Sequence, residues 1–303
     1  MSKLKVAVEP KKLQQVYLLP FVKSLKIFSF FGNDTLRQSA WMRKFSARPD
    51  EDVATRLDRL HERRRHDEVL ELVRRRSERD EEPGLLWRKA RALFFLGSSE
   101  PRGSDARLSR IVEAHEALES ALLSRGDEDP EVHKWMAIVL DERSGLINLR
   151  QRLNAAPMVK YHLRRACDLN PRDFEAHYML GTWYYQLCRL NWVQKLIAKY
   201  LITCELPNSS YKQAYKYLLQ AHELRPRAML SNVFFLGDTC FQIGHYFKAR
   251  YYLNMAVDLK PRDDEERRFL AKALHLIKKL DRYDLSKNNV LFYNYESQSF
   301  NDV

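Results

Sequence analysis

A four-residue pattern that occurs three times in the second half of the chain constrains the fold most strongly. In each copy a small apolar residue, a leucine, an alanine and a proline follow one another at offsets of four, three and five residues. The copies are Val159, Leu163, Ala166 and Pro171; Ala214, Leu218, Ala221 and Pro226; and Ala249, Leu253, Ala256 and Pro261. Residues three and four apart share one face of a helix, so each copy predicts a helix with a small packing face. The proline cannot continue that helix and marks its end.

The segments after the first two prolines predict a further helix, so that the helices occur in pairs. Leu180-Gly181 and Leu236-Gly237 stand at matching positions, and we expect each glycine to lie where two helices approach closely. A helix pair repeated at about 34 residues is the tetratricopeptide pattern. The sequence therefore predicts an all-α fold, an irregular tetratricopeptide-like helical solenoid of four to five pairs.

Three segments depart from regular repeats. Residues 145–156 interrupt the repeat that precedes Pro171. Residues 191–202 interrupt the next one with an apolar stripe at three- and four-residue spacing, which predicts an inserted amphipathic helix. Asp264 to Arg282 begins with acids and ends with bases, as the helix dipole favours, and is predicted to be a C-terminal capping helix.

The 303 residues divide into an N-terminal arm (1–48), a repeat domain (49–282) and a C-terminal tail (283–303). The net charge is +12, and residues 1–48 hold ten Lys and Arg against two acids, so most of the excess lies in this N-terminal arm. Three interpretations of the arm stay open: a mitochondrial presequence, a segment that lies on a membrane surface, or a flexible arm. Residues 49–282 form the repeat domain, and residues 283–303 are predicted to be a mobile tail.

The sequence lacks several common motifs of hydrolases, metalloenzymes and nucleotide-binding enzymes. There is no HExxH motif, no P-loop and no serine or cysteine triad with a supporting loop. The four cysteines form no CxxC pair, so they are predicted to be structural thiols, with no metal site and no cofactor. Acids interleave the basic run 63–65, which predicts a solvated face and no nucleic-acid partner. We therefore expect an interaction protein and not an enzyme.

Aromatic residues dominate the positions expected to line the concave side. The first helix of each tetratricopeptide pair faces the groove, and aromatic side chains there are unlike the Lys, Arg and Asn of grooves that hold acidic peptide ends. Two interpretations stay open: a surface for a peptide or an acyl chain in an apolar pocket, or a core covered by the insertion. The groove and pocket candidates are Phe95, Tyr178, Tyr185, Trp192, Leu196, Tyr200, Phe234 and Phe241.

Short stretches within and between the repeats form a further pattern, and several of them lie in the interruptions, which a generic repeat array would not reproduce. Their residues are His133, Lys134, Trp135, Ala137, Ile138, Leu153, Asn154, Ala155, Val159, Lys160, His162, Leu169, Asn170, Pro171, Gly181, Trp183, Trp192, Gln194, Lys195, Ile197, Ala198, Lys199, Ser210, Tyr211 and Ala214. These stretches resemble the proteins called regulators of microtubule dynamics. The resemblance covers roughly Asp50 to Asp281.

The resemblance implies a non-enzymatic protein that binds microtubules or tubulin and acts in microtubule dynamics, spindle organisation or chromosome segregation. It implies a place in the cytoplasm, on the cytoskeleton and at the spindle or spindle pole. The alternative is a mitochondria- or membrane-associated module that binds lipid or tethers membranes. Because tubulin is acidic, basic residues are the electrostatic candidates. They are Lys11, Lys12, Lys23, Lys26, Arg43, Lys44, Lys195 and Lys199.

Overall fold

The computed structural model describes residues 52–77, 82–190 and 210–283, and in these ranges the chain is helical. The first half contains α3 (Val53–Glu62), α4 (His66–Ser77), α5 (Pro83–Ser99), α6 (Asp105–Leu123), the short 3-10 helix η3 (Gly126–Glu128), α7 (Pro130–Ile147) and α8 (Leu149–Leu169). The second half contains α9 (Phe174–Cys188), α11 (Tyr211–Leu224), α12 (Leu230–Ile243), α13 (Tyr246–Val257) and α14 (Asp264–Leu280). The all-α prediction is confirmed.

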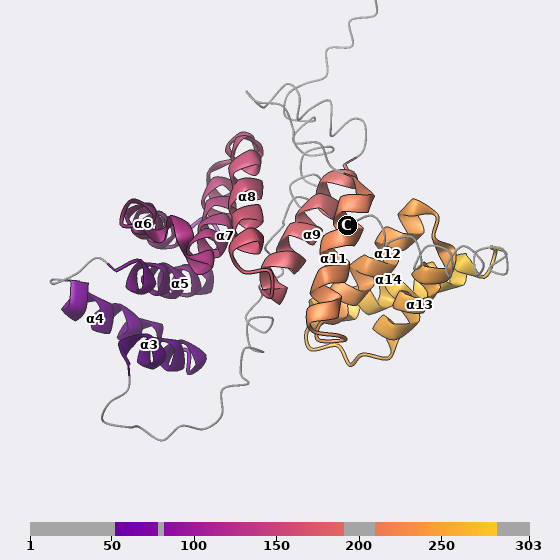
Figure 1. Cartoon of the computed structure of the whole chain (residues 1–303), viewed down its shortest axis with the longest axis horizontal. Helices are drawn as coiled ribbons and strands as arrows, with labels where there is room; N and C mark the ends of the chain where they lie inside the picture. The colour runs from indigo at the N-terminus through magenta and orange to yellow at the C-terminus, as the bar shows by residue number, and fades with distance from the viewer. Residues whose placement is uncertain (1–51, 78–81, 191–209, 284–303) are drawn as a thin grey trace, which may run out of the picture.

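The helices pack as consecutive pairs: α3 with α4, α5 with α6, α7 with α8, α9 with α11, and α12 with α13. Figure 1 shows the pairs following one another from α3 and α4 at one side of the molecule to α13 at the other. The last helix, α14, contacts both α12 and α13, as a capping helix should. Its first turn carries Asp264, Glu265 and Glu266, and its last turn carries Lys278 and Lys279. The repeat architecture and the cap therefore follow the sequence prediction.

The repeat residues lie at the centre of these pairs. Leu163, Leu218 and Leu253 are fully buried, and the helices that carry them end two to four residues before the predicted prolines, at Leu169, Leu224 and Val257. Side chains cap several helices: Asp173 accepts from two backbone N–H groups of α9, and Ser210 forms a capping box with Gln213. Gly244 ends α12 in the left-handed conformation, which favours glycine.

The predicted interruption at residues 145–156 is helical instead. The helix α7 continues to Ile147, and α8 begins at Leu149 and includes Pro157. A proline inside a helix removes one backbone hydrogen bond. In α8 the buried residues Leu153, Ala156 and Val159 surround Pro157, and α8 packs along α7. Burial of this face offsets the missing bond, so the helix is not broken.

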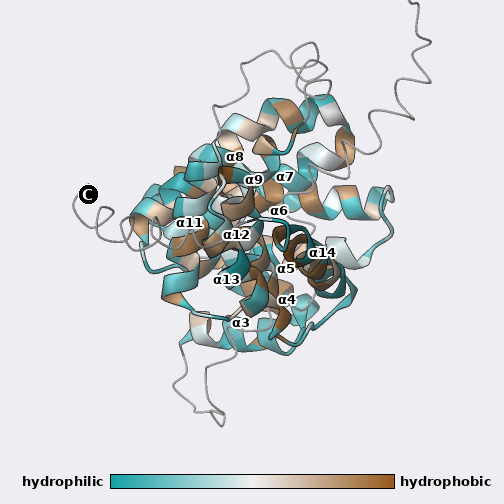
Figure 2. Cartoon of the chain, turned by 90° about the vertical axis from the view of Figure 1, so that its right-hand side faces the viewer, coloured by the Kyte–Doolittle hydropathy of each residue, from teal (hydrophilic) through white to brown (hydrophobic). Residues whose placement is uncertain are grey.

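Within each half of the molecule the first helices of successive pairs contact one another, and the second helices α8, α11 and α13 are more exposed. The helix α5 contacts α7, and α9 contacts α12, which in turn contacts α14. Almost every residue of α9 and α12 is buried, whereas α8, α11 and α13 alternate buried and exposed positions. Figure 2 shows hydrophilic residues on the outward sides of α11 and α13 and apolar residues toward the middle. We call α8, α11 and α13 the outer row.

Candidate functional site

The outer row is strongly basic, and the inner helices that it covers are acidic. The helices α8, α11 and α13 hold nine Lys and Arg against two acids, whereas α7, α9 and α12 hold two against five. The preceding second helix, α6, has two bases and four acids, so the basic row begins at α8. Residues 49–282 as a whole hold 41 Lys and Arg against 35 acids, so the basic excess of the repeat domain is concentrated in the outer row.

The helix α8 contributes most of this charge, with five Lys and Arg and one acid. One of the five, Arg152, is buried and donates from Nε to Asp141 Oδ1 at 3.0 Å, which ties α8 to α7. The other four are Arg150, Lys160, Arg164 and Arg165, and none of them forms an ion pair with another described residue. Each is exposed or half-buried. The outward side of α8 is therefore an uncompensated positive surface.

Aromatic side chains of α9 and α11 lie beside these cations. The Lys160 ammonium is 5.4 Å from the ring centroid of Tyr184 and 5.9 Å from that of Trp183. Tyr184 stacks on Tyr217 with 5.7 Å between ring centroids. The rings hold α8 against the next pair through cation–π contacts. Between α13 and α11, Lys248 Nζ lies 5.7 Å from the ring centroid of Tyr215 and donates to its hydroxyl at 3.4 Å.

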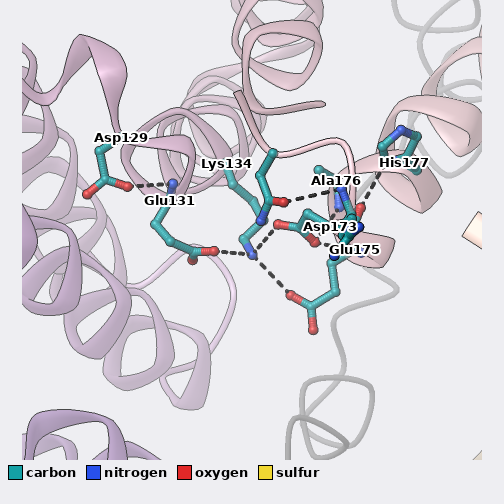
Figure 3. Close-up of polar contacts among 9 residues, drawn as sticks. Asp129, Glu131, Lys134, Asp173, Glu175, Ala176 and His177 are labelled. Atoms are coloured by element: carbon teal, nitrogen blue, oxygen red, sulfur yellow. Dashed lines mark hydrogen bonds and ion pairs between the residues drawn. The ribbon is translucent and has the colours of Figure 1, made fainter. Parts of the chain in front are cut away.

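A buried lysine joins α7 to the start of α9 (Figure 3). Lys134 Nζ donates to Glu131 at 2.7 Å, to Asp173 at 2.8 Å and to Glu175 at 3.4 Å. Burial by itself would lower the pKa of Lys134, but the three carboxylates outweigh it and raise that pKa. Burial also raises the pKa of Glu131, against the effect of Lys134. The cluster is satisfied by its own members, so its role is to hold two repeats together.

Two buried histidines link α7 and α8 next to this lysine. The Nδ1 atoms of His133 and His162 are 2.9 Å apart, and His133 Nε2 is 2.9 Å from the carbonyl oxygen of Asp127. A carbonyl only accepts, so His133 Nε2 donates, and the His162 Nδ1–H must then donate to His133 Nδ1. Burial lowers the pKa of both histidines, that of His162 to about 4. Both rings are neutral at physiological pH.

The described groove candidates contact neighbouring helices of the chain. Tyr178 donates to Ser231 of α12 at 3.2 Å, and Tyr185 lies 4.8 Å from Phe235 between ring centroids. Phe234 packs on Phe269 of α14 at 5.0 Å. These three are buried. Phe95 and Phe241 are half-buried, beside the rings of His61, His66 and Trp135 and of Tyr246 and Tyr283 respectively.

The other predicted site residues lie outside the described residues. These are the insertion residues Trp192, Leu196 and Tyr200, the lysines Lys195 and Lys199, and the arm residues Lys11, Lys12, Lys23, Lys26, Arg43 and Lys44. Their roles stay predictions. The basic side of α8 was not among the predicted sites, although five cations and one acid in a 21-residue helix were a readable signal.

The fold and surface together define an all-helical repeat protein with a basic outer face. The family model for regulators of microtubule dynamics, proteins 1 to 3, matches residues 53–281. The chain therefore belongs to the family of regulators of microtubule dynamics.

Individual relatives agree with this assignment. Regulator of microtubule dynamics protein 1 of Bos taurus is 26% identical over 228 residues, which cover 75% of this chain and 71% of that protein. The Homo sapiens protein 1 is 27% identical over 191 residues, with 63% and 60% covered. Protein 3 of Rattus norvegicus is 28% identical over 185 residues, with 61% and 39% covered.

A crystal structure of a thermophilic tetratricopeptide protein from Thermus thermophilus aligns with TM-score 0.45 at 18% identity, over 73% of this chain and 95% of that one.

Two features of other protein classes do not occur in residues 52–77, 82–190 and 210–283. No helix there combines the length and the apolar character that a membrane crossing needs. No three His, Cys, Asp or Glu side chains there are arranged to hold a metal ion.

Proposed function

We propose that this protein is a non-enzymatic microtubule-associated protein that regulates microtubule dynamics, and through them spindle organisation or chromosome segregation. Its family membership and the uncompensated positive charge on the outward side of α8 together support this function. Tubulin presents an acidic surface, and a positive face speeds the encounter with such a partner and orients it. Its expected place is the cytoplasm, on the cytoskeleton and at the spindle.

The charge for this contact comes from two parts of the chain. The outer row is a shaped surface fixed by the repeat packing. The arm adds ten bases and two acids in 48 residues, and its lysines strengthen the approach without a fixed geometry. Lys195 and Lys199 of the insertion add to the same attraction. Opposite charges across an exposed interface are screened over about 8–10 Å at physiological ionic strength, so binding should weaken with salt.

Co-sedimentation of the full chain with taxol-stabilised microtubules over a salt series tests this function. We expect binding at low salt that falls steadily as salt is added. Changing Lys11, Lys12, Lys23 and Lys26 to glutamine should weaken binding and make the salt dependence shallower, because fewer charges are then screened. If the full chain stays in the supernatant at low salt, the proposed function is wrong.

Two further measurements test whether the protein regulates microtubule dynamics and whether it acts at the spindle. Growth and shortening rates of single microtubules, followed by light microscopy with and without the protein, should differ if it regulates their dynamics. A copy tagged at its C-terminus should label the spindle in dividing cells. Label confined to mitochondria, with unchanged microtubule dynamics, would instead support the membrane-associated alternative.

A further inference from the structure

Lys160 and Arg164 stand one turn apart on α8, on the side that faces the rings of Tyr184 and Tyr217. Arg164 is exposed, and Lys160 and Tyr217 are half-buried. Residues four apart on a helix are neighbours, with about 5–6 Å between their Cβ atoms. The two cations and the ring of Tyr217 thus lie at the surface of α8 and α11, with the buried ring of Tyr184 of α9 packed against Lys160 and Tyr217. We call these four residues the cation–aromatic site.

The cation–aromatic site holds two like charges close together with no carboxylate paired to either in the described chain. Burial lowers the pKa of Lys160, and the Arg164 guanidinium lowers it further. Elsewhere on the molecule neighbouring cations share an acid: Arg88 and Arg91 both bond to Asp58, at 2.7 Å and 2.6 Å. An anion placed between Lys160 and Arg164 would relieve their repulsion.

Asp168 stands one turn after Arg164 on α8, at one end of the cation–aromatic site. Asp168 is exposed. Burial raises the pKa of Tyr217, and the negative charge of Asp168 also raises it, so the two side chains are close enough to interact. Asp168 is not within ion-pair distance of Arg164. It therefore reduces the positive potential at one end of the site without closing it.

We propose that the cation–aromatic site binds an extended, glutamate-rich polypeptide segment. In an extended chain, alternate side chains lie on the same side about 6.6–6.8 Å apart. That spacing is close to the separation of Lys160 and Arg164 on α8, so alternate carboxylates can each meet one cation. The half-buried ring of Tyr217 supplies contact area for the backbone and the methylene groups between them, and the buried Tyr184 packs against both Lys160 and Tyr217. This inference rests on the proposed function, because tubulin carries flexible acidic tails of this kind.

Fluorescence anisotropy with a labelled glutamate-rich peptide and the full-length protein tests the site directly. A peptide with glutamine in place of glutamate is the control ligand, and we expect it not to bind. The double change Lys160→Glu and Arg164→Glu should raise the Kd for the acidic peptide by about fivefold or more, since each exposed charge pair is worth up to about 1 kcal/mol. The matched control, Arg63→Glu with Arg76→Glu, makes the same charge change on exposed residues of the α3–α4 end and should leave the Kd within about twofold.

A gain of affinity separates binding from loss of fold. Asp168→Asn removes the acid beside the site, and it should tighten binding of the acidic peptide by about twofold or more. Unfolding cannot produce that result. Equal Kd values for the parent, the double variant and Asp168→Asn would overturn the proposal, and so would binding of anionic phospholipid vesicles with the same residue dependence and no peptide binding.

Microtubules stripped of their acidic tails by protease distinguish this inference from the proposed function. If the site binds the tails, stripped microtubules should bind the parent protein more weakly, and Lys160→Glu with Arg164→Glu should make no further difference. Equal binding to intact and stripped microtubules would overturn the cation–aromatic site as a tail-binding site and leave the microtubule function standing. Loss of all microtubule binding, with peptide binding retained, would overturn the function alone.

Discussion

Gly237 of α12 lies so close to Leu253 of α13 that a Cβ atom on the glycine would be 2.8 Å from the leucine Cγ. Gly181 of α9 and Leu218 of α11 repeat this relationship one unit earlier, at 2.7 Å. Both leucines belong to the repeated sequence pattern. The glycine and the leucine of each unit are therefore one packing contact between the two helices of a pair.

Replacing Gly237 by alanine should destabilise the protein. The added methyl group has no room beside Leu253, whose backbone nitrogen would be 3.1 Å from it, and overpacking a core costs about 1–3 kcal/mol. Chemical denaturation followed by circular dichroism measures the loss. The control is Gly84→Ala in α5, where an added Cβ atom would lie 3.6 Å from the flexible Arg88 side chain. That change should be neutral or stabilise by up to about 1 kcal/mol, and equal effects at the two glycines would contradict the packing argument.

Replacing Lys134 by methionine should lower the free energy of unfolding more than any substitution at the surface. It leaves Glu131, Asp173 and Glu175 facing one another without their cation, and breaking a buried ion pair costs about 3–5 kcal/mol. The double variant Lys134→Met with Asp173→Asn should recover part of that loss, because asparagine still caps α9 and one charge is gone. Urea denaturation of both variants measures the difference. A double variant less stable than the single one would show that Asp173 matters mainly to the cap.

The loss caused by Lys134→Met should also shrink as the pH falls. Burial works to raise the pKa of Asp173, but Lys134 and the backbone N–H groups of Ala176 and Glu175 together hold it below its usual value. Without the lysine the carboxylates gain protons more readily in the folded than in the unfolded state. The folded variant is therefore favoured by acid relative to the parent. Denaturation at pH 7 and pH 5 checks the direction.

Acid should destabilise the parent protein through His162. Burial, and then His133, lower its pKa in the folded state to about 4, whereas the unfolded value is about 6.5. The folded state then binds fewer protons than the unfolded one, so the stability from this group is complete above pH 6.5 and is lost as the pH falls toward 4. The loss is of the order of 2 kcal/mol. His162→Asn should flatten the curve of unfolding free energy between these pH values, and an unchanged slope would contradict the assignment.

The insertion offers a test of the predicted cover over the concave side. If Trp192, Leu196 and Tyr200 pack beside Tyr178 and Tyr185, Leu196→Asp places a charge in an apolar contact and should cost more than about 2 kcal/mol. Lys195→Asp, on the predicted polar side, should change stability by less than about 0.5 kcal/mol. Similar small effects of both changes would mean that the stripe is not packed. Lipid that co-purifies with the parent protein in native mass spectrometry would support the apolar pocket instead.

Local sequence patterns were enough to predict the helices and their pairing. The spacing of Leu218, Ala221 and Pro226 states which face is buried and where the helix stops, because helical periodicity and the geometry of proline act over a few residues. The same patterns did not predict that residues on both sides of Pro157 form one helix, α8. There the cost of a proline within the helix is offset by packing against α7, a contact that no local pattern of α8 describes.

The chain by itself determined the repeat fold, the glycine contacts and the family, since all three depend on residue types at short, fixed spacings. The tertiary structure decided which charged side chains form ion pairs and which do not. Arg152 and Lys160 belong to the same helix, but one is buried against Asp141 and the other lies beside Tyr184 with no carboxylate paired to it in the described chain. Likewise Lys134 of α7 meets Asp173, the residue that precedes α9, although the two are 39 residues apart in the sequence. Charges act through space, so their pairing follows from the fold and not from the order of residues along the chain.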